Sequence, residues 1–158
     1  MSDTSLEARV RRLEDIEALK QLKVRYAAYC DDDYDADGLV PLFTENAIWD
    51  GGAMGRYEGH AALRAFFSSA DQIVPFAVHH VTNPIIEVDD DQATGSWYLW
   101  QPMVMQGGDQ AMWLAARYSD RYRRVDGRWM FEHVKIDVRF FSPYEKGWGE
   151  VPMAEVPS

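Results

Sequence analysis

The residues best suited to proton transfer are two adjacent histidines, His79 and His80, inside an apolar and β-branched run from Phe76 to Val88. Histidine suits this chemistry because its unperturbed pKa lies near neutral pH. The run predicts a β-strand, in which neighbouring side chains point to opposite faces of the sheet. Only one of the two imidazoles can therefore face a given interior, and we expect that one to act as a catalytic base inside a pocket.

A cluster of carboxylates could supply the partner of such a base. Asp31, Asp32, Asp33 and Asp35 follow a long helical pattern, at the end of a helix where the dipole disfavours negative charge. A solvated turn, with one Asp capping the next helix, accounts for most of the cluster but does not require all of it. The pattern leaves open which carboxylate pairs with the histidine.

Helical periodicity dominates the first half of the chain. Apolar residues recur at intervals of three and four from Leu6 to Tyr29, which predicts a long amphipathic helix with a break near Glu14 and Asp15. Charged residues, Lys23 among them, fill its other faces. A short helix around Leu39, a short strand over 46–50 and a helix from about His60 to Ser69 follow.

From Val74 onward the sequence predicts strands. We expect them over 76–88, 93–105, 111–125 and 128–141, with a bulge or bend at Gly95 and Pro102. Asp126-Gly127 is typical of a two-residue hairpin turn. This order predicts an α+β fold with helices on one face of a curved sheet. We expect a single domain over 1–158, with a leading segment (1–12) and a C-terminal arm (142–158) that pack loosely.

Composition narrows the possible partners. The chain has 158 residues and a formal net charge of -10, which argues against nucleic acid and against an anionic membrane surface. Its only cysteine, Cys30, excludes an internal disulfide. No apolar run approaches a membrane span, and the N-terminus lacks the pattern of a signal peptide. These features predict a cytoplasmic protein.

Several segments together are similar to a known family. They are Arg25-Tyr26-Ala27-Ala28-Tyr29-Cys30-Asp31, Leu42-Phe43-Thr44-Glu45-Asn46-Ala47-Ile48-Trp49, His79-His80-Val81-Thr82-Asn83-Pro84 and Tyr122-Arg123-Arg124-Val125-Asp126-Gly127-Arg128-Trp129. The chain resembles the SnoaL-like branch of the nuclear transport factor 2-like superfamily from about Leu13 to Trp148. Within it, the chain is most similar to scytalone dehydratase, hexachlorocyclohexane dehydrochlorinase and the bile acid 7α-dehydratase group.

The resemblance implies a cone-shaped α+β barrel, in which N-terminal helices pack on a strongly curved, mixed and largely antiparallel sheet. It also implies a dyad of Asp31, at the end of the first helix, and His79, which with Asn83 matches a His-x-x-x-Asn strand pattern. Tyr29 and Tyr26 fall where such pockets carry a tyrosine. A second pocket histidine, expected on the next strand, is replaced there by Tyr98, Trp100 and Gln101. His133 or Arg139 on the last strand are the candidates to substitute for it.

These elements predict a cofactor-independent lyase of the dehydratase type, acting on a small hydrophobic cyclic molecule such as a steroid or polyketide. The imidazole would remove a carbon-bound proton, and the carboxylate would stabilise the imidazolium. A tyrosine, Tyr26, Tyr29 or Tyr98, could stabilise a developing enolate oxygen. The candidates for an apolar wall are Trp49, Met54, Tyr57, Trp97, Trp100, Met103, Met105, Trp113 and Phe140, of which alternation allows only about half of the strand residues to face inward.

Two other classes of function stay open at this point. One is an isomerase or epoxide hydrolase on the same fold, and the other is a non-catalytic ligand-binding or assembly subunit. We expect no metal site, because the adjacent histidines diverge and no ligand spacing is present, and no phosphate-binding loop. An exposed outer sheet face and the resemblance both predict a homodimer or homotrimer.

Overall fold

The computed structural model describes residues 5–107 and 110–156, so residues 1–4 and 157–158 of the two expected loose ends lie outside it. The first element is α1 (Leu6–Asp31), which begins where the Ser5 side chain accepts a hydrogen bond from the Ala8 amide. The expected break near Glu14 and Asp15 is wrong, because α1 is continuous.

Asp15 is instead a buried anchor for α1. Its carboxylate accepts hydrogen bonds from the Trp129 indole at 2.9 Å and from the Arg124 guanidinium at 2.6 Å. Both donors lie on the last two strands of the sheet. The acidic residue that suggested a helix break therefore ties α1 to that sheet.

The remaining elements follow in the predicted order of helices and then strands. The helical segments are α2 (Ala36–Leu39), η1 (Val40–Leu42), η2 (Gly52–Met54), α3 (His60–Ile73) and α4 (Gly147–Glu150). The strands are β1 (Phe43–Asp50), β2 (Arg56–Glu58), β3 (Phe76–Ala77), β4 (His80–Asp89), β5 (Gln92–Val104), β6 (Ala111–Val125) and β7 (Arg128–Pro143).

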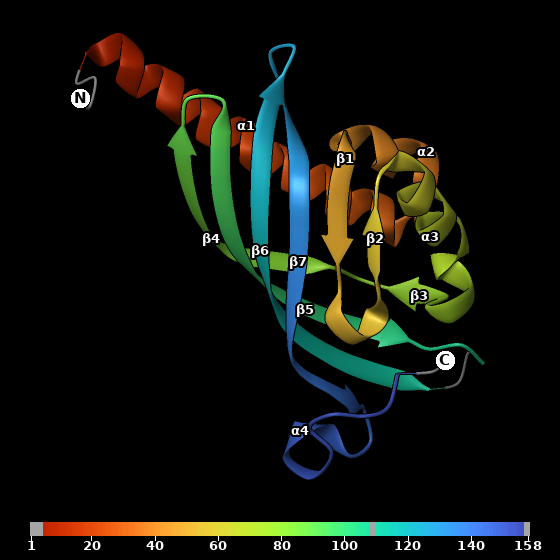
Figure 1. Cartoon of the computed structure of the whole chain (residues 1–158). Helices are drawn as coiled ribbons and strands as arrows, with labels where there is room; N and C mark the ends of the chain where they lie inside the picture. The colour runs from red at the N-terminus through yellow and green to blue at the C-terminus, as the bar shows by residue number, and fades with distance from the viewer. Residues whose placement is uncertain (1–4, 108–109, 157–158) are drawn as a thin grey trace.

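Within the described residues these strands form one seven-stranded sheet in the order β2-β1-β7-β6-β5-β3, with β4 also paired to β5. β1 runs parallel to β7, and the other pairs are antiparallel. The helix α1 crosses behind β4, β6 and β7, and α2 and α3 lie beside β1 and β2 (Figure 1). The prediction of an α+β fold, with helices on a mixed and mostly antiparallel sheet, is confirmed.

The expected irregularity at Gly95 and Pro102 is not found in the pairing of β5 with β6, whose register is continuous from Gln92 to Val104. Gly95 instead leaves room for the Tyr122 ring, since a Cβ there would lie 2.9 Å from it. The bulge lies on β4, where Asn83 adopts a left-handed φ of 55°. Asparagine tolerates this conformation better than most residues.

Pro102 acts on the neighbouring strand rather than on its own. The run predicted as one strand over 76–88 is split into β3 and β4 by Val78 and His79. The Val78 amide donates to the Pro102 carbonyl at 3.1 Å, but proline has no N–H to return the bond. The ladder is therefore incomplete at this point, immediately before His79.

Lys23 departs from its predicted place on the charged faces of α1, because it is completely buried. Its ammonium contacts Asp120 at 2.8 Å and lies 3.3 Å from the centroid of the Tyr118 ring. The Tyr122 hydroxyl donates to the same Asp120 carboxylate at 2.9 Å. Burial lowers the pKa of Lys23 and raises the pKa of Asp120, and the charge of each opposes the shift of the other.

The C-terminal arm turns back against β7. The Phe141 amide donates to the Pro152 carbonyl at 3.0 Å, and the Ala154 amide donates to the Phe141 carbonyl at 2.7 Å. Trp148 of α4 stacks on Phe140 with 4.8 Å between ring centroids. In the described residues, no helix combines the length and the apolar character needed to cross a membrane.

The buried ion pair generates a prediction about stability. Lys23→Met or Asp120→Asn alone should lower the free energy of unfolding by about 3–5 kcal/mol, because each leaves the other polar group buried without its partner. The double variant should recover part of this loss. Urea denaturation measures all three. Additive losses in the double variant would contradict a direct coupling of the pair.

Candidate active site

Asp31 and His79 form a close pair between the end of α1 and the gap that separates β3 from β4. The Asp31 carboxylate lies 2.6 Å from Nδ1 of His79. The same carboxylate accepts the backbone N–H of His79 at 3.0 Å and 3.1 Å through its two oxygens. One carboxylate thus holds both the main chain and the ring of a single residue.

This arrangement determines the hydrogen-bonding role of the ring. A carboxylate accepts hydrogen bonds and does not donate them, so Nδ1 carries the hydrogen in the neutral imidazole. Nε2 is then the nitrogen with a free lone pair. The side chain of His79 is only 7% exposed, and it lines a large apolar cavity.

The geometry selects among the acidic residues that the sequence left open. Asp35 caps α2, accepting from the amides of Asp37 and Gly38. Asp32 and Asp33 are exposed, and the chain turns sharply at Asp33, where φ is 51°. Asp31 is the carboxylate that contacts the histidine.

His80 points away from the cavity, as strand alternation requires. It is exposed, and its Nδ1 lies 3.3 Å from the Trp100 carbonyl. Asn83, the other half of the His-x-x-x-Asn pattern, is exposed in the β4 bulge. Its place in the motif therefore reflects backbone shape rather than contact with the site.

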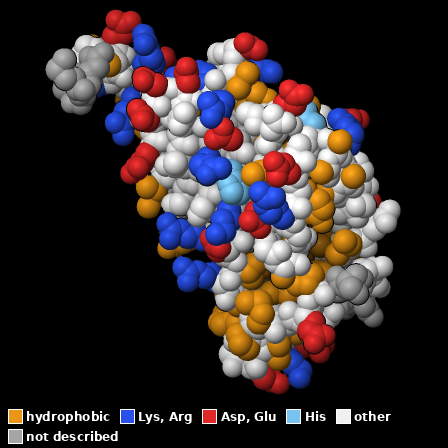
Figure 2. Space-filling model, in the orientation of Figure 1, with side chains coloured by type: hydrophobic (Ala, Val, Ile, Leu, Met, Phe, Trp, Pro, Cys, Tyr) orange, Lys and Arg blue, Asp and Glu red, His pale blue; other side chains and the backbone are white. Residues whose placement is uncertain are grey.

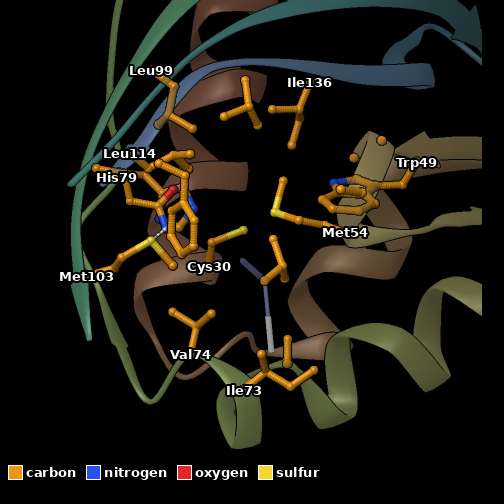
Figure 3. A pocket seen from close by; sticks show the side chains of 18 of the residues that line it. Cys30, Trp49, Met54, Ile73, Val74, His79, Leu99, Met103, Leu114 and Ile136 are labelled. Carbon is orange, nitrogen blue, oxygen red and sulfur yellow. Dashed lines mark hydrogen bonds between the residues drawn. The ribbon is translucent and has the colours of Figure 1, made fainter. Parts of the chain in front are cut away.

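The cavity that His79 lines has a volume of about 460 Å³ and a mostly apolar surface (Figure 3). Its wall is built by α1, α3, the η2 turn, strands β1 and β5–β7, and the C-terminal arm through Met153 and Val156. Of the residues expected to bind substrate, Tyr26, Trp49, Met54 and Met103 lie in this wall, as does Met105. Among the described residues, neither lysine nor arginine lines it.

Much of the expected aromatic wall lies on the opposite, convex face of the sheet. Leu99 and Gln101 face the cavity, so Tyr98 and Trp100 point outward, and Trp113 does the same beside Leu114. Placing these residues and Phe140 in the pocket is wrong. Trp100, Trp113, Phe140, Tyr144 and Trp148 instead contact one another in an outer aromatic cluster. Figure 2 shows hydrophobic side chains gathered at the end of the molecule where α4 lies, at the bottom of the view.

Tyr57 and Trp97 are also outside the cavity lining, each for its own reason. Tyr57 stacks on Phe66 at 4.2 Å between centroids, and Phe66 rather than Tyr57 lines the cavity. Trp97 is buried on the concave face, but its indole donates to the Tyr122 hydroxyl at 3.0 Å. Trp97 therefore belongs to the Lys23–Asp120 network.

Neither of the cationic candidates on β7 reaches the pocket. His133 lies on the convex side opposite Arg121, and burial followed by the charge of Arg121 lowers its pKa. Arg139 is the extra residue of a β7 bulge between Val138 and Phe140, and it is exposed. No substitute for a second pocket histidine comes from this strand.

Tyr34, which the sequence analysis did not nominate, takes the place expected of Tyr29. The Tyr29 ring packs over Gly38 of α2, where a Cβ would lie 2.4 Å from it, and is absent from the cavity lining. Tyr34 lines the cavity and meets the His79 ring edge-on at 6.4 Å. The sequence feature that could have indicated Tyr34 is its position as the one aromatic residue in the acidic segment from Asp31 to Asp35.

Burial keeps the tyrosine and cysteine side chains of the cavity in their neutral forms. It raises the pKa of the Tyr34 hydroxyl and raises those of Tyr26 and Tyr118 well above the usual value. It also raises the pKa of the Cys30 thiol to about 12, which argues against a thiolate nucleophile. The Tyr26 hydroxyl accepts the Trp49 indole N–H at 2.9 Å, leaving its own hydrogen to donate.

Residues 11–135 match the sequence profile of the SnoaL-like domain, which is most of the chain. The chain belongs to the SnoaL-like domain family. Its fold is the nuclear transport factor 2-like fold of the family's solved structures, and the resemblance predicted from the sequence is confirmed.

Among solved structures, this SnoaL-like protein is similar to a hexachlorocyclohexane dehydrochlorinase (LinA type 2), with 23% identity, a TM-score of 0.80 and coverage of 85% of this chain and 92% of that one. A candidate aromatic ring hydroxylase from Novosphingobium aromaticivorans is 27% identical, with a TM-score of 0.76 and coverage of 83% and 94%. A candidate scytalone dehydratase from the same organism is 19% identical, with a TM-score of 0.77 and coverage of 84% and 89%. The distant relatives of this chain thus include proteins named as lyases.

The dyad geometry predicts the tautomer of His79. Nitrogen NMR of the wild-type protein, recorded at a pH where the imidazole is neutral, should show the ring hydrogen on Nδ1, and Asp31→Ala should remove this preference because the acceptor is lost. Asp33→Asn is the matched control, since Asp33 is exposed in the same turn, and it should leave the His79 resonances unchanged. A neutral ring protonated on Nε2 in the wild type would contradict the assignment.

Proposed function

We propose that this SnoaL-like protein is a cofactor-independent lyase of the dehydratase type, acting on a small hydrophobic cyclic molecule. The observation that carries the proposal is the Asp31–His79 pair at the wall of an apolar cavity. Distant relatives with lyase names add support for the reaction class. Because this fold hosts many functions, the site and not the fold carries the argument.

The chemistry is an elimination next to a carbonyl group. His79 Nε2 takes the proton from the carbon beside the carbonyl, and the C–H electron pair moves into an enolate. The enolate then re-forms the carbonyl as the C–O bond to the β-hydroxyl breaks. The imidazolium returns its proton to the departing hydroxide, so the products are an enone and one water molecule.

Asp31 and the tyrosines have supporting roles in this sequence. Asp31 orients the ring and stabilises the imidazolium, since its carboxylate already holds Nδ1. Tyr34, protonated and beside the ring, can donate a hydrogen bond to a developing oxyanion or to the departing hydroxyl. The apolar wall excludes bulk water, which strengthens these interactions.

The cavity also favours a catalytic site over an assembly subunit. A non-catalytic relative could fill the cone with its own side chains, whereas this cone contains about 460 Å³ of free volume. That volume falls within the range of sites for small molecules. The lack of lysine and arginine in the described lining disfavours an anionic substrate.

The proposal can be tested with 3-hydroxy-1-tetralone, which loses water to form the fluorescent product 1-naphthol. The wild-type protein should accelerate this loss above the rate in buffer. His79→Ala should lower the acceleration by about 100- to 10,000-fold, the usual contribution of a general acid–base group. Asp31→Asn should also lower it strongly.

His80→Ala is the matched control, because His80 is the adjacent histidine and points away from the cavity. It should retain the wild-type rate. No acceleration by the wild-type protein, or equal rates in wild type and His79→Ala, would contradict the proposal.

A further inference from the structure

Gln101 is a polar side chain almost completely buried in the apolar wall of the cavity. It lies on β5, is only 4% exposed, and lines the cavity between Leu99 and Met103. An amide at such a place costs desolvation free energy unless hydrogen bonds satisfy it. A buried amide at this position is therefore expected to have a hydrogen-bond partner.

The strand register places Gln101 opposite His79. β3 pairs Ala77 with Met103, and β4 pairs His80 with Trp100. Counting inward from both pairs sets residue 79 across from residue 101. Directly opposite side chains on antiparallel strands share a face, with Cβ atoms about 4.5–5.5 Å apart. Both His79 and Gln101 accordingly line the cavity.

The protein satisfies the Gln101 amide poorly. Its Nε2 donates to the Met103 sulfur at 3.6 Å, the contact that ends on the labelled Met103 in Figure 3. A thioether is a weak acceptor, whereas a primary amide offers two donors and an accepting oxygen. A ligand oxygen in the cavity would supply a much stronger partner than the sulfur does.

We propose that Gln101 determines substrate specificity by binding a neutral oxygen of the substrate, the carbonyl that acidifies the C–H bond facing His79. The inference deepens the proposed function and rests on it. It selects an uncharged, oxygenated ring compound over a hydrocarbon or halocarbon of equal size, since only the former accepts the amide hydrogen. Because the base and the amide lie side by side, a substrate whose carbonyl oxygen binds Gln101 presents the adjacent C–H bond to His79.

The test compares two ring compounds that differ by one carbonyl oxygen, 1-tetralone and tetralin, with binding measured by calorimetry. The quantity of interest is the ratio of their dissociation constants in each protein, because differences in ligand hydration cancel between proteins. Wild type should favour 1-tetralone, and Gln101→Met should lower this preference about tenfold, the effect of one ordinary hydrogen bond. Retained tetralin binding shows that the cavity is intact.

Gln92→Met is the matched control, because Gln92 is exposed at the other end of the same strand. It should keep the wild-type preference. Gln101→Leu serves as a second variant if Gln101→Met fails to fold, with the same expected loss. An unchanged preference in the Gln101 variants, or no preference in the wild type, would overturn the inference.

The two proposals fail separately. His79→Ala should keep the preference for 1-tetralone while losing the formation of 1-naphthol, because the histidine acts on the proton and not on the oxygen. Loss of naphthol formation in His79→Ala, with an unchanged ligand preference in Gln101→Met, would overturn only the role of Gln101. A preference that depends on Gln101 in a wild-type protein without dehydration activity would overturn only the proposed reaction.

Discussion

The structure of the site depends on one carboxylate that binds two N–H groups of the same residue. Asp31 ends α1, where the helix dipole disfavours a negative charge, and the amide and ring of His79 compensate by donating to it. Val78 is hydrogen-bonded to Pro102 of β5, so the N–H of the next residue, His79, points away from β5 and can donate to Asp31. The contact therefore joins the first helix to the sheet and holds the imidazole at the cavity wall.

Ionisable side chains are stabilised differently in two buried regions of the protein, the Lys23–Asp120 pair and the cavity. Behind the cavity, Lys23 and Asp120 form a buried ion pair that the hydroxyl of Tyr122 extends. Inside the cavity, burial keeps the tyrosines and the thiol neutral, and the Asp31–His79 pair lies at the cavity wall. Tyr118 separates these regions, with its ring over the Lys23 ammonium and its surface in the cavity lining. In this SnoaL-like protein the ring of Tyr118 thus lies between the buried Lys23 ammonium and the cavity.

Membership of the SnoaL-like family accounts for the architecture, but the reaction depends on the residues that fill the cone. The likeness to the dehydrochlorinase and the candidate dehydratase, at 23% and 19% identity, is a likeness of fold. Two side chains lie close to the histidine in this chain: Tyr34 meets its ring, and Gln101 lies opposite it in the strand register. The comparisons show the family and the fold, and the proposed reaction and substrate rest on the side chains of the cavity.

The sequence alone determined the order of helices and strands and the hairpin at Asp126-Gly127, because periodicity and turn residues are local properties. Its short motifs also carried the family resemblance that nominated Asp31 and His79. Only the tertiary structure decided which aromatic residues face the cavity, since alternation divides a strand into two faces without saying which one the sheet curves around. It also decided that Tyr34 rather than Tyr29 approaches the histidine. The pairs Lys23–Asp120 and His79–Gln101 likewise depend on contacts between segments far apart in the chain, whose register local pattern does not contain.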